Sequence, residues 1–326
     1  MKDHKQPRTL QAAIVHFSDP DRALDYMVRL RWPNGVVTCP ACGRDDAVFL
    51  TNQRKWQCKS IHTKRQFSAK VGTIFEDSPI SLDKWLTAVW MLANCKNGVS
   101  SYEIAAAIGV TQKSAWFMMH RIRKAMQVGS LVKIGGGGSE VEVDETFIGG
   151  KARNMHAAVH ERRISGTGGR DKTAVMGILE RGGNVRLQVV PSRRKKVLQD
   201  EVRKHVAAGT ALYTDFLLSY EGLDGEYKHE VIDHAERYVE GRVHTNGLEN
   251  FWSLLKRGLH GTYVSVEPFH LHRYLDEQAF RYNNRRHPDR TPVEPADRFE
   301  RVLSHVLSKR LTYAELTGKT GEEAAF

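Results

Sequence analysis

A short block of metal-ligand residues constrains the fold of this chain most strongly. Cys39 and Cys42 are separated by two residues, and Cys58 and His62 follow in the same turn-rich stretch. Thiolates at this spacing can face one tetrahedral ion, so residues 36–78 are predicted to form a small ribbon held by Zn²⁺. The alternative is a redox-active Cys-x-x-Cys pair, with Cys58 and His62 incidental. Short strands are expected near Ala47–Leu50, Lys55–Cys58 and Gln66–Ser68.

Helical patterns lie on both sides of this block. Asp19 and Pro20 have the pattern of an N-cap followed by proline, which begins a helix within an N-terminal helical segment at 1–35. Residues 79–130 are also predicted to be helical. Near their middle, two short helices meet at a turn around Gly109, which is the pattern of a helix-turn-helix.

The second helix of this pair is rich in polar and basic residues. Such a helix can lie in the major groove of DNA, with basic side chains on phosphates and polar ones near base edges. The alternative is a charged face that is only solvated. The net charge of +11 favours a polyanionic partner, and double-stranded DNA is the usual one. The candidate DNA-binding residues are Gln112, Lys113, Arg121, Arg123 and Lys124.

The composition argues against membrane and exported proteins. No apolar run approaches the about 18 residues that a membrane-spanning helix needs. The first residues lack the apolar core of a signal peptide. We therefore expect a cytoplasmic, nucleoid-associated protein with no membrane partner.

A run of four glycines, Gly135–Gly138, marks the clearest domain boundary, and 131–139 is interpreted as a flexible linker. The sequence after it mixes strand and helix patterns, which predicts an α/β domain with a mixed sheet over 140–290. The remaining 291–326 are interpreted as a C-terminal tail. The elements expected first in this domain are an extended segment, a hairpin, a helix and a short strand, at 140–148, 174–191, 195–208 and 211–216.

Three acidic residues of this domain are candidates for binding a hard cation. Asp144 lies in the first extended segment and Asp215 ends the later short strand, and carboxylates at neighbouring strand positions bind divalent cations through oxygen. Each alone is equally consistent with a capping or surface residue. Glu249 lies on an amphipathic helix over 246–259, opposite the apolar stripe and in line with Lys256 two turns later. That face offers a carboxylate for a cation and an ammonium for a phosphate, although a solvated helix face is the alternative.

Several short segments, taken together, resemble one family. The earlier ones are CPACG, WQCKS and QFSAKVGTIFEDSPISLDKW, and the later ones are VEVDETFIGGK, YTDF, HTNGLENFWSLLKRGLHGTY and HLHRYLDEQAFRYNNR. They resemble the zinc-ribbon head and the DDE catalytic domain of ISXO2-like transposases of bacterial insertion sequences. The resemblance covers approximately residues 20–290.

The resemblance implies an RNase H-like fold over 140–290, preceded by the zinc ribbon and the helix-turn-helix. It also implies that Asp144, Asp215 and Glu249 hold two Mg²⁺ or Mn²⁺ ions, with Lys256 as the basic residue after the third acid. One ion would activate water, or later a DNA 3′-OH, and the other would stabilise the leaving oxygen. The implied enzyme is a DDE transposase. It would free 3′-OH ends at the terminal inverted repeats and join them to target DNA as a homo-oligomer.

Two points stay open at this stage. Asn246 lies one turn before Glu249 on the same face and could share or take the ligand role; Glu249 is preferred because a carboxylate neutralises cation charge and an amide does not. In the ribbon, Ile61 stands where the family's commoner pattern has a cysteine, so His62 is the expected replacement. The rival functions are a domesticated sequence-specific DNA-binding regulator and an RNase H-like nuclease that cuts without joining.

Overall fold

The computed structural model describes residues 7–127, 132–149, 172–232 and 244–319. The chain divides into two compact units. The ribbon-and-helix unit comprises Met1–Gln127 with Pro292–Glu323, and the sheet unit comprises Val128–Thr291 with Ala324–Phe326. Most of the stretch expected to be a C-terminal tail therefore packs with the N-terminal half of the chain. The parts of the predicted catalytic domain at 150–171 and 233–243 lie outside the described residues.

The ribbon is a sheet of three short antiparallel strands, β1 (Val48–Leu50), β2 (Lys55–Gln57) and β3 (Gln66–Phe67), close to the segments predicted. A 3-10 turn, η1 (Thr51–Gln53), joins the first two strands. Trp56 of β2 is buried, with its ring centroid 6.0 Å from that of Phe67 and 5.6 Å from that of Trp32. These few aromatic rings are a small core, as expected of a ribbon this short.

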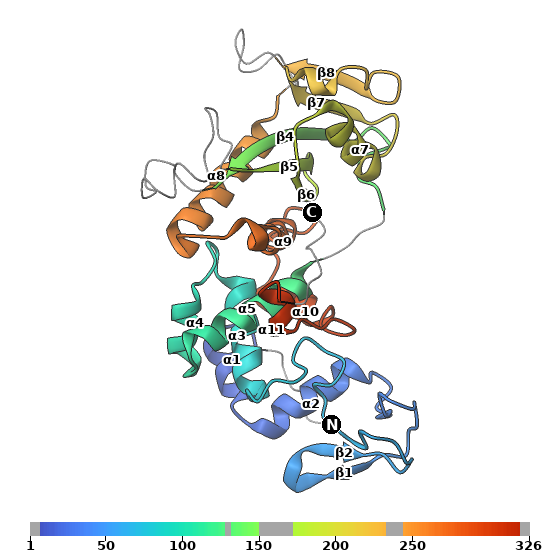
Figure 1. Ribbon diagram of the computed structural model, residues 1–326, viewed down its shortest axis with the longest axis vertical. Coiled ribbons are helices and arrows are strands. Elements are labelled where there is room, and N and C mark those ends of the chain that lie inside the picture. The colour runs from blue at the N-terminus through green and yellow to red at the C-terminus, as the bar shows by residue number, and fades with distance from the viewer. Residues whose placement is uncertain (1–6, 128–131, 150–171, 233–243, 320–326) are drawn as a thin grey trace. The chain divides into compact units, whose positions relative to one another are not determined.

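Seven helices are described in the same unit (Figure 1): α1 (Leu10–Phe17), α2 (Pro20–Arg31), α3 (Leu82–Asn94), α4 (Ser101–Ile108), α5 (Gln112–Met126), α10 (Pro295–Leu303) and α11 (Tyr313–Leu316). The apolar helix α3 is buried over most of its length and packs against α1, α2, α4, α5 and α10. It is therefore the centre of this unit's core.

The start of α2 confirms the cap predicted from sequence at Asp19. The Asp19 side chain accepts the backbone N–H groups of Asp21 and Arg22 at the start of α2. Ser100 begins α4 with a capping box. Gly109 ends α4 with φ 62°, a conformation that glycine adopts without a Cβ penalty, and so turns the chain into α5.

The sheet unit is built on a five-stranded sheet in the order β6-β5-β4-β7-β8. β4, β5 and β6 are antiparallel neighbours, whereas β7 lies parallel to β4 and β8 lies parallel to β7. This is the mixed sheet predicted from sequence. The strands are β4 (Glu140–Ile148), β5 (Thr173–Glu180), β6 (Val185–Val190), β7 (Ala211–Asp215) and β8 (Lys228–Ile232).

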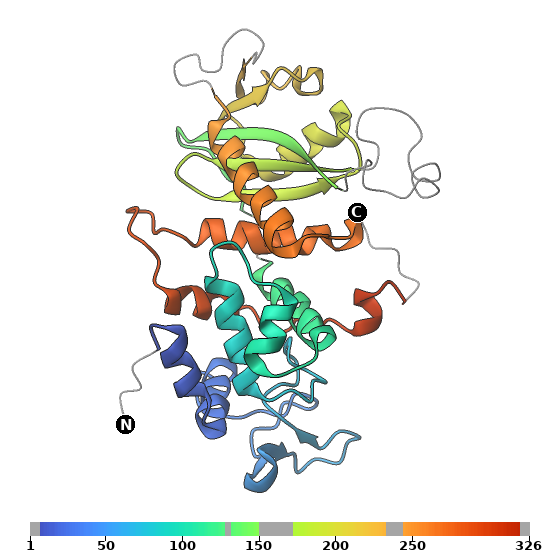
Figure 2. The same cartoon turned by 90° about the vertical axis from the view of Figure 1, so that its left-hand side faces the viewer.

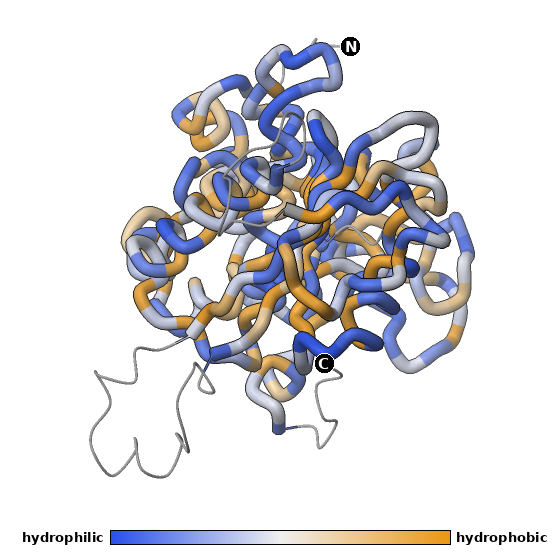
Figure 3. The backbone as a smooth tube through the Cα atoms, turned by 90° about the horizontal axis from the view of Figure 1, so that it is seen from above, coloured by the Kyte–Doolittle hydropathy of each residue, from blue (hydrophilic) through white to orange (hydrophobic). Residues whose placement is uncertain are grey.

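Helices cover both faces of this sheet. On one face α7 (Lys195–His205) buries Leu198 in a cluster with Val141 and Val143 of β4. On the other face, α8 (Asn246–Gly258) and α9 (Leu271–Asn283) pack over β5 and β6, and Figure 2 shows α8 (orange) running across the strands. Figure 3 traces the hydrophobic and hydrophilic residues along the chain. Three further short elements lie in the described part of this unit, η3 (Leu218–Tyr220), η4 (Leu259–Tyr263) and η5 (Pro268–His270).

The four-glycine run, predicted to be a flexible linker, is bonded to the sheet unit. All four glycines have positive φ. The N–H of Gly136 donates to Thr210 Oγ1 at 2.9 Å, and a Cβ at Gly135 would lie 2.5 Å from that same oxygen. Just before the run, Ile134 forms a parallel bridge with Val206. The glycines here allow a close approach of two backbone segments as well as turning the chain.

Candidate active site and metal-ligand cluster

The register of two parallel strands brings Asp144 and Asp215 to the same level of the sheet. The last paired residues of β4 and β7 are Val143 and Thr214, and each aspartate follows directly. Because side chains alternate along a strand, Asp144 lies on the face opposite Val143, which is the face that α8 covers. Asp144 is therefore separated from Val141 and Val143, which pack on the other face of the sheet.

The carboxylates at this point repel one another. Burial raises the pKa of Asp144 to about 6, with the indole N–H of Trp252 opposing and the charges of Asp215 and Glu249 adding to the rise. Glu249, on α8, is thus close enough to Asp144 for its charge to raise the pKa of that carboxyl. Negative charges held near one another in a partly buried position repel, which disfavours the ionised carboxylates. A bound divalent cation neutralises these charges. The donor set therefore fits Mg²⁺ or Mn²⁺.

A fourth carboxylate, Glu145, belongs to the same neighbourhood, and sequence reasoning missed it. Burial, together with the charges of Asp215 and Asp144, raises the pKa of Glu145 to about 8, while Arg193 lowers it. The hydroxyl of Tyr220 donates to its Oε1. The signal available in the sequence was its position directly after Asp144. Side chains alternate along a strand, however, so the Glu145 side chain points to the other face of the sheet.

The remaining candidates of the catalytic set lie on α8. Asn246, Glu249 and Lys256 are all exposed, whereas Phe251 and Leu255 on the other side of the helix are buried. The amphipathic face predicted from sequence is therefore present. Asn246 is the first residue of the helix, and Lys256 lies in its last turn.

A buried ionic network fixes the start of α8 to β4. Glu142 Oε2 accepts the backbone N–H of Leu248 at 3.0 Å, and Arg181 Nε donates to Glu142 Oε1 at 2.8 Å. Arg181 also donates to Glu140 at 3.2 Å and to the carbonyl of His244 at 2.6 Å. A carboxylate at a helix N-terminus accepts a hydrogen bond from an otherwise unpaired backbone N–H, and its negative charge interacts favourably with the helix dipole. Glu142 thus helps to set where Glu249 lies over the sheet.

Removing this carboxylate is expected to cost stability. Glu142→Ala leaves a buried N–H and part of the Arg181 charge unpaired, so we expect the free energy of unfolding of the sheet unit to fall by about 3 kcal/mol. Urea unfolding followed by circular dichroism measures this. Glu230→Ala is the matched control, an exposed glutamate on β8, and it should change stability by less than about 0.5 kcal/mol. Equal loss in the two variants would contradict the role given to Glu142.

The second cluster lies in the ribbon and holds the four predicted metal ligands. The ligand atoms of Cys39, Cys42, Cys58 and His62 all lie within 4.8 Å of one another. Cys39 Sγ is 3.5 Å from His62 Nε2, and Cys42 Sγ is 3.5 Å from Cys58 Sγ. Four ligands around one Zn²⁺ would be separated by about 3.8 Å. The cluster therefore fits tetrahedral zinc. Ile61, at 95% exposure, faces solvent.

The residues predicted to contact DNA are not equally accessible. Arg121 and Arg123 are buried, and Arg121 donates to the carbonyls of Ile74, Glu76 and Leu311. The guanidinium of Arg121 therefore joins three segments of its own unit. Helical periodicity places a residue on a face but does not say what covers that face. The other candidates remain at least partly exposed: Gln112, Lys113 and Lys124.

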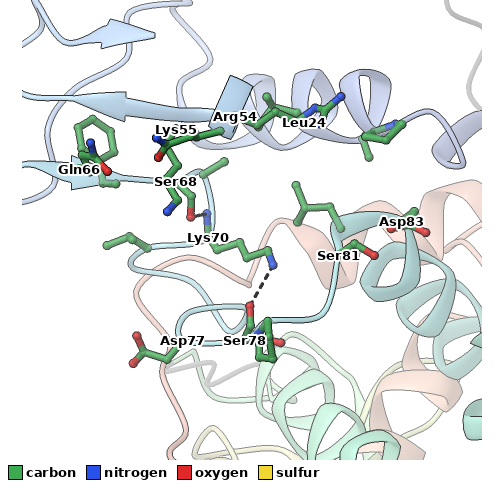
Figure 4. A pocket seen from close by; sticks show the side chains of 18 residues that line it. Leu24, Arg54, Lys55, Gln66, Ser68, Lys70, Asp77, Ser78, Ser81 and Asp83 are labelled. Atoms are coloured by element: carbon green, nitrogen blue, oxygen red, sulfur yellow. Dashed lines mark hydrogen bonds between the residues drawn. The ribbon is translucent and has the colours of Figure 1, made fainter. Parts of the chain in front are cut away.

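A hollow of about 670 Å³ lies in the ribbon-and-helix unit, between α2, the ribbon strands and the segment before α3 (Figure 4). Its wall is partly apolar, with Leu24 among the lining residues. Lys70 lies along it and donates to the carbonyl of Ser78 at 3.1 Å. None of the residues assigned to catalysis, metal binding or DNA contact lines it.

Both clusters lie within segments that match known protein families. The ISXO2-like transposase domain matches residues 135–283, and the transposase zinc-ribbon domain matches residues 18–62. A protein of Halobacterium salinarum, described as an uncharacterized protein in transposable element ISH50, is 29% identical over 264 residues, which is 76% of this chain and 85% of that protein. An uncharacterized transposase-like protein of Haemophilus influenzae is 34% identical over 97 residues, or 29% of this chain and 78% of the relative.

The two matched domains define a transposase with a zinc-ribbon domain and a DDE domain. The chain belongs to the ISXO2-like family of insertion-sequence transposases. Among the helices that the structure describes, none has the length and apolar character needed to cross a membrane.

Proposed function

We propose that this chain is a DNA transposase enzyme that cuts at the terminal inverted repeats of its element and joins the freed 3′-OH ends to target DNA. The observation that carries the proposal is that Asp144 and Asp215 directly follow the last paired residues of two parallel strands, and that the charges of Asp215 and of Glu249 on α8 both raise the pKa of Asp144. The strand order β6-β5-β4-β7-β8, in which β5 runs antiparallel to the other four described strands, supports an RNase H-like fold for this unit.

The three carboxylates would hold two Mg²⁺ or Mn²⁺ ions. Bound there, the ions supply charge for activating the attacking oxygen and for stabilising the leaving one. Lys256, exposed two turns after Glu249 on α8, would bind a DNA phosphate. Asn246 remains the alternative third ligand, since it lies on the same exposed side of α8.

For DNA binding, we propose the ribbon and the α4–α5 pair as a helix-turn-helix. Gln112, Lys113 and Lys124 are at least partly exposed and are the residues we retain for direct contact. Arg121 and Arg123 would act indirectly, because they are buried in the unit that presents α5. The net charge of +11 supports a DNA partner, and action on chromosomal DNA places the protein in the cytoplasm with the nucleoid. Two element ends must be held at once, which favours a homo-oligomer on DNA.

The test is a strand-transfer assay with purified protein, labelled element ends, a supercoiled target plasmid and Mg²⁺. We expect nicking that exposes a 3′-OH at each end and then joined products. Nicking without joining would favour the RNase H-like nuclease. Specific binding of ends with no cleavage in either Mg²⁺ or Mn²⁺ would favour the DNA-binding regulator. Either result would overturn the proposal.

A further inference from the structure

We infer that Trp252 is a positioning residue for Asp144, a role that rests on the proposed function of the carboxylates. The indole Nε1 of Trp252 donates to Asp144 Oδ2 at 2.8 Å. The other oxygen, Oδ1, accepts the backbone N–H of Glu145 at 2.7 Å. Each carboxylate oxygen therefore has one donor, and the plane of the carboxylate is fixed by two hydrogen bonds from different elements.

The sheet is shaped to admit this indole. Gly177 of β5 is the residue directly paired with Asp144 of β4. A Cβ at Gly177 would lie 2.6 Å from Cζ2 and 2.7 Å from Cη2 of Trp252, closer than real contacts allow. Gly177 is a strand residue without positive φ. Its lack of a side chain is therefore explained by the close approach of the indole beside Asp144.

The donor comes from the same helix as the third acid. Trp252 follows Glu249 by three residues on α8, and its side chain is only 5% exposed. Glu142 holds the start of this helix to β4 through the N–H of Leu248. A single rigid element thus places Glu249 over the sheet and orients the carboxylate of Asp144.

The chemical reason for such a contact is that ligand orientation matters as much as ligand identity. A carboxylate oxygen has two lone-pair directions, and an indole N–H is a donor only. When the N–H occupies one direction on Oδ2, the remaining directions on both oxygens point to fixed positions. Hydrogen bonds to metal ligands from outside the coordination sphere typically change metal affinity or activity by about 10–100-fold.

The test compares metal binding by the full-length protein and its Trp252→Phe variant. Phenylalanine keeps a buried ring and removes the N–H. We expect Mn²⁺ binding, measured by titration calorimetry, to weaken by about 10-fold or more, and the Mg²⁺ concentration for half-maximal cleavage to rise in parallel. The urea unfolding midpoint reports any general damage and should move much less.

Trp85→Phe is the matched control. Trp85 is also buried and also donates its indole N–H, to Ser78 Oγ at 3.1 Å, but it lies in the ribbon-and-helix unit. This variant should lose stability without any change in Mn²⁺ affinity. If Trp85→Phe weakened Mn²⁺ binding as much as Trp252→Phe did, the effect would be general and the inference would be wrong.

Gly177→Ala provides a second, independent arm. The added Cβ should displace the indole of wild-type Trp252 and weaken Mn²⁺ binding. It should weaken binding less in the Trp252→Phe background, where the larger ring is gone and the contact with Leu248 Cδ2 at 2.9 Å remains. Additive effects would contradict a shared mechanism.

Failure of the inference and failure of the proposed function are distinguishable. If the wild-type protein bound no Mn²⁺, or if Asp144→Asn did not abolish its Mn²⁺ binding, the carboxylate site itself would be wrong. If that binding were present and Trp252→Phe left it unchanged, only the role of Trp252 would be refuted.

Discussion

Glu249→Gln will lower the rate of Mg²⁺-dependent strand cleavage by about 1,000-fold. The amide keeps the size of the side chain and removes the charge that helps to hold the cation, and a bound metal contributes several kcal/mol of transition-state stabilisation. Glu249 is exposed on α8, so the fold should be unaffected. Single-turnover cleavage of preformed protein–DNA complexes at saturating Mg²⁺ measures the effect on the chemical step.

Asn246→Ala decides the question that the sequence leaves open. If Glu249 is the third ligand, this variant should slow cleavage by less than about 10-fold, because the loss of a group that does not bind the metal typically costs no more than about 10–100-fold. Asn250→Ala is the matched control, because Asn250 is also an exposed asparagine on α8 and has no assigned role. A severe defect in Asn246→Ala with a mild one in Glu249→Gln would move the ligand role to Asn246.

Local patterns in the sequence predicted the elements that carry the site. Strand alternation places Asp144 opposite Val143, and helical periodicity places Glu249 opposite Phe251, because both depend only on the backbone period. The caps at Asp19 and Ser100 were predictable for the same reason, since each cap is made within a few residues of the chain.

Long-range contacts account for what sequence reasoning did not find. The partners of Glu142 are Arg181 and Leu248, far away along the chain, and no local pattern indicates them. Arg121 donates to the carbonyl of Leu311, from a stretch interpreted as a tail. Gly177 is an intermediate case. A glycine inside a strand indicates that another group approaches the backbone closely, but only the fold identifies that group as Trp252.

The largest effect on stability is expected in the ribbon. Cys58→Ser should abolish zinc binding and unfold residues around β1, β2 and β3, because Zn²⁺ supplies about 10 kcal/mol or more to domains of this kind. Cys58 is fully buried beside Cys42, and the aromatic core around Trp56 is small. Zinc content by atomic emission and limited proteolysis of the full-length protein measure the outcome.

Two further variants test the geometry of the ribbon. Cys95→Ser is the control, a cysteine at the end of α3 and outside the cluster, and it should retain one zinc per chain. In a His62→Ala background, Ile61→Cys should fail to restore zinc, because residue 61 faces solvent at 95% exposure while His62 Nε2 faces Cys39. Restoration would mean that the ribbon can turn residue 61 inward and accept the four-cysteine arrangement. Full zinc in Cys58→Ser would remove the Cys₃His site altogether. Since the metal-ligand spacing is what most limits the possible folds of residues 36–78, that result would leave the ribbon without its main source of stability.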